Sequence, residues 1–251
     1  MGGCCKTMSN IALQIAGLNF SYGKKQVLHD LAFEVEAGQC CILLGPNGAG
    51  KSTLFSLITR LYAHKQGQIK LAGFDIQQQP LKALAQLGVV FQQTTLDLDL
   101  TVQQNLRYHA ALQGISRKNA NLAIEEQLER LGMFERRSEV VRQLNGGHRR
   151  RVEIARALMH KPGVLLLDEP TVGLDVPSRQ AIVEHVHQLS QDSHLAVLWA
   201  THLMDEIHAS DKIVVIHQGA LKAQGLLGDV IQQARAENIN DAFFKLTHRK
   251  A

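Results

Sequence analysis

The stretch Gly45-Pro46-Asn47-Gly48-Ala49-Gly50-Lys51-Ser52-Thr53 matches the pattern G-x-x-x-x-G-K-[ST] at every fixed position. It follows the apolar run Cys40–Leu44 and precedes residues with helical spacing. A strand, a glycine-rich loop and a helix in this order predict a phosphate-binding loop, because the backbone N–H groups can curl around an anion at the positive end of the helix dipole. A glycine-rich turn without a ligand is the alternative, and the flanking strand and helix disfavour it.

The side chains of the loop predict which groups it holds. Lys51 is expected to reach the β- and γ-phosphates of a nucleotide, and the Ser52 hydroxyl is expected to bind Mg²⁺. The candidate nucleotide-binding residues of the loop are Gly45, Pro46, Asn47, Gly48, Ala49, Gly50, Lys51, Ser52 and Thr53.

The bulk composition is that of an ordinary globular protein. The 251 residues are 45% hydrophobic and 20% charged, which is enough for one large domain with a sizeable core. The net charge of +4 is too small to indicate nucleic-acid binding by itself. No apolar run approaches the roughly 18 residues of a membrane-spanning helix, so if the protein acts on a membrane we expect it to bind at the membrane surface.

The cysteines and the start of the chain bear on the cellular compartment. Cys4-Cys5 and Cys40-Cys41 are adjacent pairs without the C-x-x-C spacing of zinc or redox motifs. This usage predicts a reducing, cytosolic compartment. The first residues resemble a myristoylation signal, except that Lys6 stands where Ser or Thr is required. Residues 1–10 are expected to be a disordered lead, with Met8 as an alternative start.

Hydrophobic periodicity divides the chain into an α/β core and an all-helical insert. Short strands before the loop predict an antiparallel lead-in, and the spacing becomes helical from about residue 92 to 150. Apolar strands then alternate with helices, which indicates a parallel sheet covered on both faces. The predicted strands are Ile11–Ile15, Gly17–Tyr22, Leu31–Glu36, Cys40–Leu44, Gly88–Phe91, Val164–Leu167, Leu195–Ala200, Lys212–His217 and Gly219–Gln224, with a hairpin at Gln68–Phe74. The predicted helices are Lys51–Leu61, Val102–Gln113, Lys118–Leu131, Arg150–His160, Ser178–Ser190, Met204–Ala209 and a tail at Leu226–Lys245.

Two carboxylates end one of the buried strands. The apolar run Val164–Leu167 delivers Asp168 and Glu169 to the carboxyl edge of the sheet, where parallel α/β folds bind their ligands. Asp168 is expected to hold the Mg²⁺ shell, and Glu169 can accept a proton from water. A strand that merely ends in a polar turn is the alternative, which the phosphate-binding loop upstream disfavours.

A third motif resembles a known family. Leu144-Asn145-Gly146-Gly147-His148 and the following residues through Leu158 resemble the L-S-G-G-Q signature of ABC-type ATPases and its Q-R-V-x-[IL]-A-R-A-L continuation. The resemblance runs from about residue 13 to 224 and includes the phosphate-binding loop and the D-E-P strand end. It implies an α/β P-loop NTPase of ABC type, with a mostly parallel sheet core, an antiparallel β lead-in and an inserted α-helical subdomain.

Four smaller landmarks fall in the order of that family. Tyr22 resembles the aromatic residue that stacks on adenine, and Gln92 the glutamine that reaches the metal and the attacking water. His202 resembles the switch histidine that contacts the γ-phosphate, and Asp175 lies in the segment that crosses the dimer interface. Without the family, Tyr22 reads as a strand aromatic and His202 as a structural histidine.

The resemblance implies a mechanism shared between two copies. Each ATP, with Mg²⁺ held by Ser52, Gln92 and Asp168, lies between the phosphate-binding loop of one chain and the signature of the other. Lys51 and the loop amides stabilise charge on the γ-phosphoryl group, Glu169 is the general base, and His202 holds phosphate and base in register, with Gln92 beside them.

The signature departs from the family at two positions. Asn145 replaces the usual Ser and His148 the usual Gln, so we expect a modified but active site, since an Asn amide can also donate to phosphate. His148 begins a basic cluster with Arg149, Arg150 and Arg151, in which positive charge lies unfavourably at a helix start. Either the cluster is a solvated face, or it is tolerated because ATP from the other subunit or an acidic partner lies against it.

The remaining histidines are expected to be surface or packing residues. His185 and His187 are two positions apart on a helix and so face different ways, and the others are scattered. No metal site is predicted among them.

The domain assignment is a single ABC ATPase domain over residues 11–251. Residues 11–91 and 151–225 form the nucleotide-binding core, 92–150 the helical insert and 226–251 a helical tail. The expected partners are a second copy and an integral membrane subunit, at the cytoplasmic face of the inner membrane, with no direct nucleic-acid contact. Export is favoured, on a resemblance to drug-resistance and polysaccharide exporters and, more narrowly, to a group associated with quinoprotein alcohol oxidation. An importer, or a soluble ATPase acting on ribosomes or DNA, is the alternative.

Overall fold

The computed structural model describes residues 10–248, and its centre is a six-stranded sheet. All neighbouring strands of this sheet are parallel except the last pair, in which β10 runs antiparallel to β9. The predicted lead and its lipidation motif lie, apart from Asn10, outside the described residues. The strand order is β10 (Ala220–Leu226), β9 (Lys212–His217), β3 (Cys40–Leu44), β8 (Ala196–Thr201), β7 (Val164–Asp168) and β6 (Leu87–Val90).

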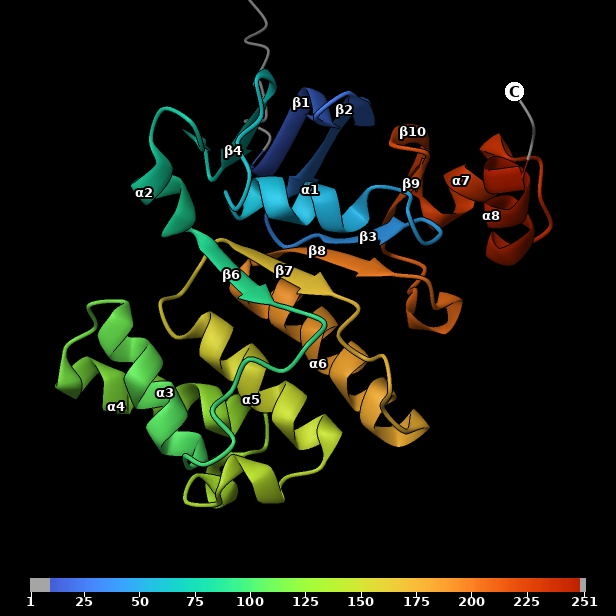
Figure 1. Cartoon of the computed structure of the whole chain (residues 1–251). Helices are drawn as coiled ribbons and strands as arrows, with labels where there is room; N and C mark the ends of the chain where they lie inside the picture. The colour runs from blue at the N-terminus through green and yellow to red at the C-terminus, as the bar shows by residue number, and fades with distance from the viewer. Residues whose placement is uncertain (1–9, 249–251) are drawn as a thin grey trace, which may run out of the picture.

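A second, antiparallel sheet covers one face of this core. Helix α1 (Lys51–Ile58) lies between the two sheets, and its apolar side chains join a single buried cluster with both of them (Figure 1). The order is β2 (Lys25–Glu36), β1 (Ile11–Tyr22), β4 (Gln66–Leu71) and β5 (Phe74–Asp75). The antiparallel lead-in that the sequence predicts is therefore present as a separate layer.

Helices cover the opposite face of the parallel sheet (Figure 1). Alternate residues of each buried strand point to the two faces: Cys40, Ile42 and Leu44 pack with the helical layer, whereas Cys41 and Leu43 pack with α1 and the antiparallel sheet. None of the helices between residues 10 and 248 has the length and apolar character that crossing a bilayer requires. The helices of this layer are α3 (Val102–Leu112), α4 (Arg117–Arg130), α5 (Gly146–Leu158) and α6 (Val176–Ser193).

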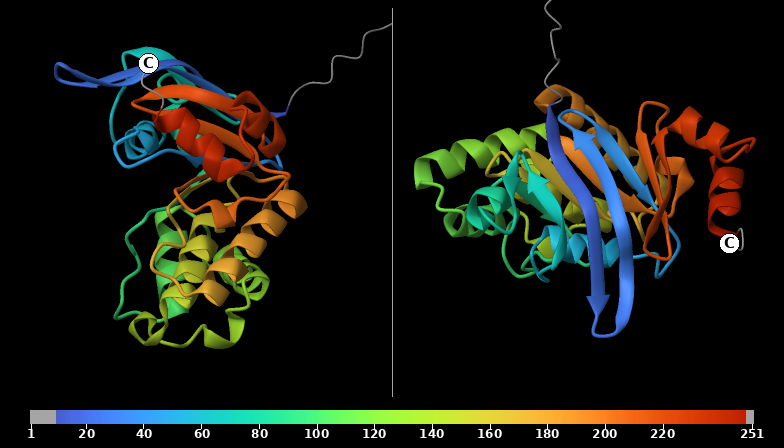
Figure 2. Two further views of the ribbon diagram at one scale, coloured as in Figure 1. Left: turned by 90° about the vertical axis from the view of Figure 1, so that its right-hand side faces the viewer. Right: turned by 90° about the horizontal axis from the view of Figure 1, so that it is seen from above.

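The lead-in strands differ from their predicted bounds. The sequence predicts two strands separated at Ala16, but β1 is continuous, because its pairing with β2 shifts register between Ile15 and Leu18 while Gly17 adopts φ +58°. β2 also begins at Lys25 rather than Leu31, so the two strands form a long ribbon whose turn projects from the body of the molecule (Figure 2). The first part of β2 was not predicted because polar residues near its start obscure the alternating apolar pattern of a strand.

Helix ends account for the other differences. α5 begins at Gly146, not Arg150, because Asn145 caps it, and the predicted helix at Met204 is a single 3₁₀ turn, Met204–Glu206. The predicted tail helix is two helices, α7 (Leu227–Gln233) and α8 (Ile239–His248). Short α2 (Pro80–Leu84) was not predicted.

Candidate functional site

Most of the predicted residues of the loop and the strand ends line one cavity of about 690 Å³, whereas Gly45 and Ala49 are not among the described residues on its wall. The phosphate-binding loop leaves the carboxyl end of β3 and the Asp168-Glu169 pair the end of β7, two strands away, so the parallel sheet brings them to the same edge. Lys25, Val27 and Val172 also line the cavity and were not predicted. The predicted residues on its wall are Tyr22, Pro46, Asn47, Gly48, Gly50, Lys51, Ser52, Thr53, Gln92, Asp168, Glu169 and His202.

The loop holds Lys51 by its own carbonyl groups. The Lys51 ammonium donates to the carbonyl of Gly45 at 2.5 Å and to that of Pro46 at 3.3 Å. Burial lowers the pKa of Lys51, and the charges of Glu169 and Asp168 partly offset this. Gly50 precedes α1 at φ +109°, a conformation that a side chain would strain. The loop therefore presents a cation and a helix N-terminus to the same space.

A distant turn supports the loop. Gly219, between β9 and β10, donates its N–H to the carbonyl of Ala49 at 2.9 Å and accepts from the N–H of His29 at 2.9 Å. A Cβ at Gly219 would lie 1.8 Å from the carbonyl oxygen of Val27, so only glycine fits. The phosphate-binding loop, β2 and the β9–β10 turn are thus interlocked at one residue.

Glu169 lies between two other predicted residues. Its Oε2 accepts from the Gln92 amide at 3.1 Å, and its Oε1 is 3.2 Å from His202 Nδ1. Its backbone has φ +47°, which is uncommon and costly outside glycine and is held here by an N–H bond to the carbonyl of Ala200. Beside it, burial and the charge of Glu169 raise the pKa of Asp168. The Glu169 carboxylate is therefore oriented by Gln92 on one side and by His202 on the other.

Tyr22 stands at the mouth of the cavity on the projecting ribbon. Its ring packs edge to face against Phe20 and Tyr62, with centroids 4.9 and 5.4 Å away, and it remains 43% exposed. This packing fixes the ring while leaving a surface on which a planar group can stack.

The signature residues lie away from this cavity. Leu144, Asn145, Gly146, Gly147 and His148 are absent from the described residues that line it. The Asn145 side chain caps α5 by accepting from the N–H of His148 at 2.8 Å. Asp175 caps α6 through the N–H of Ser178 at 2.9 Å, and Ser178 packs so close to Gly147 that a Cβ there would lie 2.7 Å from its hydroxyl. Signature and Asp175 segment therefore form one surface.

The predicted basic cluster is divided in the structure. Arg149 turns back to the carbonyls of Val141 and Arg142, at 3.2 and 2.7 Å. Arg150 is 7% exposed and makes a 2.6 Å ion pair with Glu153. The solvated-face alternative is thus wrong for Arg150, because the helix begins four residues earlier and turns this side chain inward, whereas Arg149 stays partly exposed.

Arg150 also joins the signature helix to the segment that carries Gln92. Its guanidinium donates to the carbonyls of Phe91 and Gln92, at 2.6 and 2.9 Å. Glu153 accepts from the N–H of Thr95 at 2.8 Å. The i,i+3 spacing of Arg150 and Glu153 was the available sequence signal, but it indicated only a helix surface pair.

Comparisons with known proteins agree with one another. The family model described as ABC transporter matches residues 28–172. The linearmycin resistance ATP-binding protein LnrL of Bacillus subtilis is 38% identical, over 92% of this chain and 77% of that protein. The Nod factor export ATP-binding protein I of Rhizobium johnstonii is 37% identical, over 87% of this chain and 70% of that protein. A solved ATP binding subunit of an ABC transporter is 27% identical with a TM-score of 0.82, over 94% of this chain and 99% of that one.

Proposed function

Because the chain belongs to the ABC transporter family, in which it is an ATP-binding, ATP-hydrolysing subunit, we propose that it powers an exporter. In this proposal it binds ATP with Mg²⁺, pairs head to tail with a second copy, and drives separate integral membrane subunits from the cytoplasmic face of the inner membrane. Closure of the pair on ATP moves the membrane subunits, and hydrolysis reopens it.

The position of Glu169 carries the catalytic part of the proposal. A general base must lie at the cavity that binds the phosphates and must be oriented toward the attacking water. The place of Glu169 on the cavity wall supports this role, as do the contacts of its two oxygens with Gln92 and His202 at 3.1 and 3.2 Å. Lys51, on the same wall, supplies positive charge to the transferred phosphoryl group.

The oxygen atoms on the cavity wall suit Mg²⁺. Ser52 offers a hydroxyl, Gln92 an amide oxygen and Asp168 a carboxylate, the ligand types that this ion prefers. When bound, the ion would neutralise charge on the β- and γ-phosphates. Asp168 gains from such a cation, because its own charge is costly beside Glu169 in a partly buried position.

The location of the signature supports the head-to-tail pair. Asn145 and the following glycines lie outside the cavity of their own chain, next to the Asp175 segment. In a head-to-tail dimer this surface closes over the ATP of the other copy, with the N-terminus of α5 directed at the γ-phosphate. An Asn amide there retains a donor for the phosphate.

The relatives support export as the direction of transport. LnrL is named for linearmycin resistance and its rhizobial counterpart for Nod factor export, and both cover most of this chain. A solved subunit from Clostridium perfringens, 26% identical with a TM-score of 0.82, is part of the ABC transporter complex cbiONQ, which illustrates assembly with other subunits.

Recovery of the partner tests this function. The full chain is purified from detergent-solubilised membranes under native conditions, and the bound proteins are identified. We expect an integral membrane protein in stoichiometric amount and ATP hydrolysis by the complex. Recovery with ribosomes or nucleic acid in place of any membrane protein would rule out the transporter function.

A matched variant separates binding of the partner from catalysis. Lys51 is 6% exposed, so Lys51→Ala removes the phosphate-binding amine without changing the outer surface. We expect this variant to retain the membrane partner and to lose hydrolysis. Loss of both would mean that the partner recognises only the nucleotide-bound shape.

A further inference from the structure

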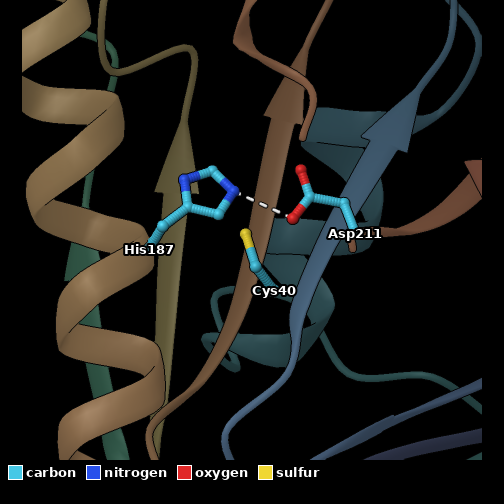
Figure 3. A group of neighbouring side chains, drawn as sticks. All are labelled: Cys40, His187 and Asp211. Atoms are coloured by element: carbon cyan, nitrogen blue, oxygen red, sulfur yellow. Dashed lines mark hydrogen bonds and ion pairs between the residues drawn. The ribbon is translucent and has the colours of Figure 1, made fainter. Parts of the chain in front are cut away.

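A buried cluster of three different ligand types lies at the opposite end of β3 from the phosphate-binding loop. Cys40 begins β3, His187 lies on α6 and Asp211 directly precedes β9. Their exposed fractions are 7%, 6% and 1%. Their potential ligand atoms all lie within 4.8 Å of one another, and Figure 3 shows the three side chains converging from these separate elements.

The ligand atoms of His187 and Asp211 are oriented by second contacts. His187 Nδ1 is 2.8 Å from the carbonyl oxygen of Val183, to which it donates, and this bond directs Nε2 toward Asp211 Oδ1, also 2.8 Å away. Asp211 Oδ2 accepts the backbone N–H of His208 at 2.7 Å. Metal-binding histidines and carboxylates are held by outer contacts of this kind.

We propose that Cys40, His187 and Asp211 bind a divalent transition-metal ion, with Zn²⁺ the best match. Zn²⁺ takes thiolate, imidazole and carboxylate ligands together. The charges agree, since one thiolate and one carboxylate balance a divalent cation and leave no net charge in a buried place. Each ligand type is present once, which distinguishes the cluster from a group of surface acids.

The cluster lies beside a space that can supply a fourth ligand. A cavity of about 250 Å³ adjoins it, lined by the three side chains and also by Gln39, Ser190 and Ser210. Water from this cavity can complete a tetrahedron. With bonds of about 2.0–2.3 Å the ligand atoms of one ion stand roughly 3.5 Å apart. Binding would therefore move His187 Nε2 and Asp211 Oδ1 apart from their 2.8 Å contact and draw in any pair near the 4.8 Å limit.

The sequence could not indicate this site. The spacing of His185 and His187 on one helix argues only against a metal shared by these two histidines. The partners of His187 in the cluster are Cys40 and Asp211, which the pairing of β3 with β9 brings together. The proposal is independent of the nucleotide site.

Metal titration of the full chain tests the proposal. The untagged protein, with Cys4→Ser and Cys5→Ser to remove the two thiols near the start of the chain, is stripped with a chelator and titrated with Zn²⁺ against a chromophoric chelator. We expect one ion per chain. Titration with Co²⁺ should add the thiolate-to-cobalt absorption band that only a cysteine ligand produces.

Two variants and a matched control decide the outcome. Cys40→Ala should weaken Zn²⁺ binding by about 100-fold or more, since even outer-shell partners contribute about 10- to 100-fold. Cys41→Ala, in the next, fully buried position on the other face of the sheet, should bind like the parent. His187→Gln retains a donor toward Asp211 but loses the imidazole, so it should fold and fail to bind. Absence of Zn²⁺ binding in the parent, or unchanged binding in Cys40→Ala and His187→Gln, would show that His187 and Asp211 form only an ion pair.

Discussion

At the scale of single residues, Glu169 combines a strained backbone with a fully engaged carboxylate. We expect Glu169→Gln to slow ATP turnover by roughly 10²-fold or more, because the amide cannot take a proton from water. ATP affinity should be retained, since the side chain keeps its size and one acceptor for Gln92. Steady-state hydrolysis and nucleotide binding by the partner-bound protein measure the two effects. An unchanged rate would remove Glu169 from the role of general base.

Arg150 gives a stability prediction at the same scale. Arg150→Ala leaves the buried Glu153 carboxylate without its cation and should cost about 3–5 kcal/mol in the free energy of unfolding. Arg142→Ala is the control: that arginine pairs with Asp99 on an exposed surface, and its removal should leave the denaturant midpoint nearly unchanged. Equal effects of the two substitutions would contradict the structural role of Arg150.

Single residues also show what sequence reasoning can reach. Lys51, Asp168 and Glu169 were predictable because each is fixed within a few positions of a strand end. The inward turn of Arg150 was not, since it depends on carbonyls at Phe91 and Gln92, about 59 positions upstream. Contacts between segments distant in the sequence carry no local pattern.

At the scale of elements, the cap of α5 predicts how substitutions of Asn145 in the signature change the stability of the protein. Asn145→Ala should lower the free energy of unfolding by about 1 kcal/mol, because the N–H of His148 loses its acceptor. Asn145→Ser restores the family residue and keeps an acceptor for the N–H of His148. Its free energy of unfolding should therefore stay within a few tenths of a kcal/mol of that of the parent protein. Urea unfolding measures both, and a stable Asn145→Ala variant would mean that the cap contributes nothing.

The contact between α3 and the end of α5 predicts an acid sensitivity. Burial, with the charges of Arg156 and His160, lowers the pKa of His109 to about 4. The unfolded chain takes up this proton near pH 6.5 and the folded chain does not, so stability falls as pH drops from 6.5 toward 4. In His109→Gln this loss should be smaller. Urea unfolding at several pH values checks it, and an identical pH slope in the variant would contradict the assignment.

Among the strands, those buried on both faces of the sheet were the ones that the sequence predicted best. The strands of the parallel core are almost wholly apolar and were found within about two residues. The first half of β2 is mostly exposed and polar apart from Val27 and the buried Leu28, and its pairing with β1 is visible only in three dimensions. The tail was predicted as one helix because periodicity cannot show the break between α7 and α8.

At the scale of the whole molecule, a head-to-tail pair predicts complementation. Lys51→Ala disables one half of each composite site and Gly146→Asp the other. A Cβ at Gly146 meets only the end of the Leu174 side chain, at 3.0 Å, so this change is easier to accommodate than one at Gly147. Each variant alone should be inactive, whereas a one-to-one mixture should recover roughly a quarter of the wild-type rate, because mixed dimers hold one intact site.

The double variant is the control for this experiment. When Lys51→Ala and Gly146→Asp are in the same chain, mixed dimers with the wild type have no intact site. Only the wild-type dimers should then hydrolyse ATP. A rate in this mixture clearly above the quarter that the wild-type dimers supply, or no recovery in the first mixture, would exclude the head-to-tail arrangement.

Gly219 has a consequence for the order of events on the ribosome. The loop that begins at residue 45 is braced by a turn some 170 positions later, and β3 lies between β8 and β9 in the sheet. Synthesis proceeds from the N-terminus at about 5–20 residues per second, so the loop waits roughly ten seconds or more for its support. We therefore expect a nascent chain stalled before residue 219 to bind nucleotide more weakly than one in which this turn has been made, because its phosphate-binding loop lacks the bond to Gly219.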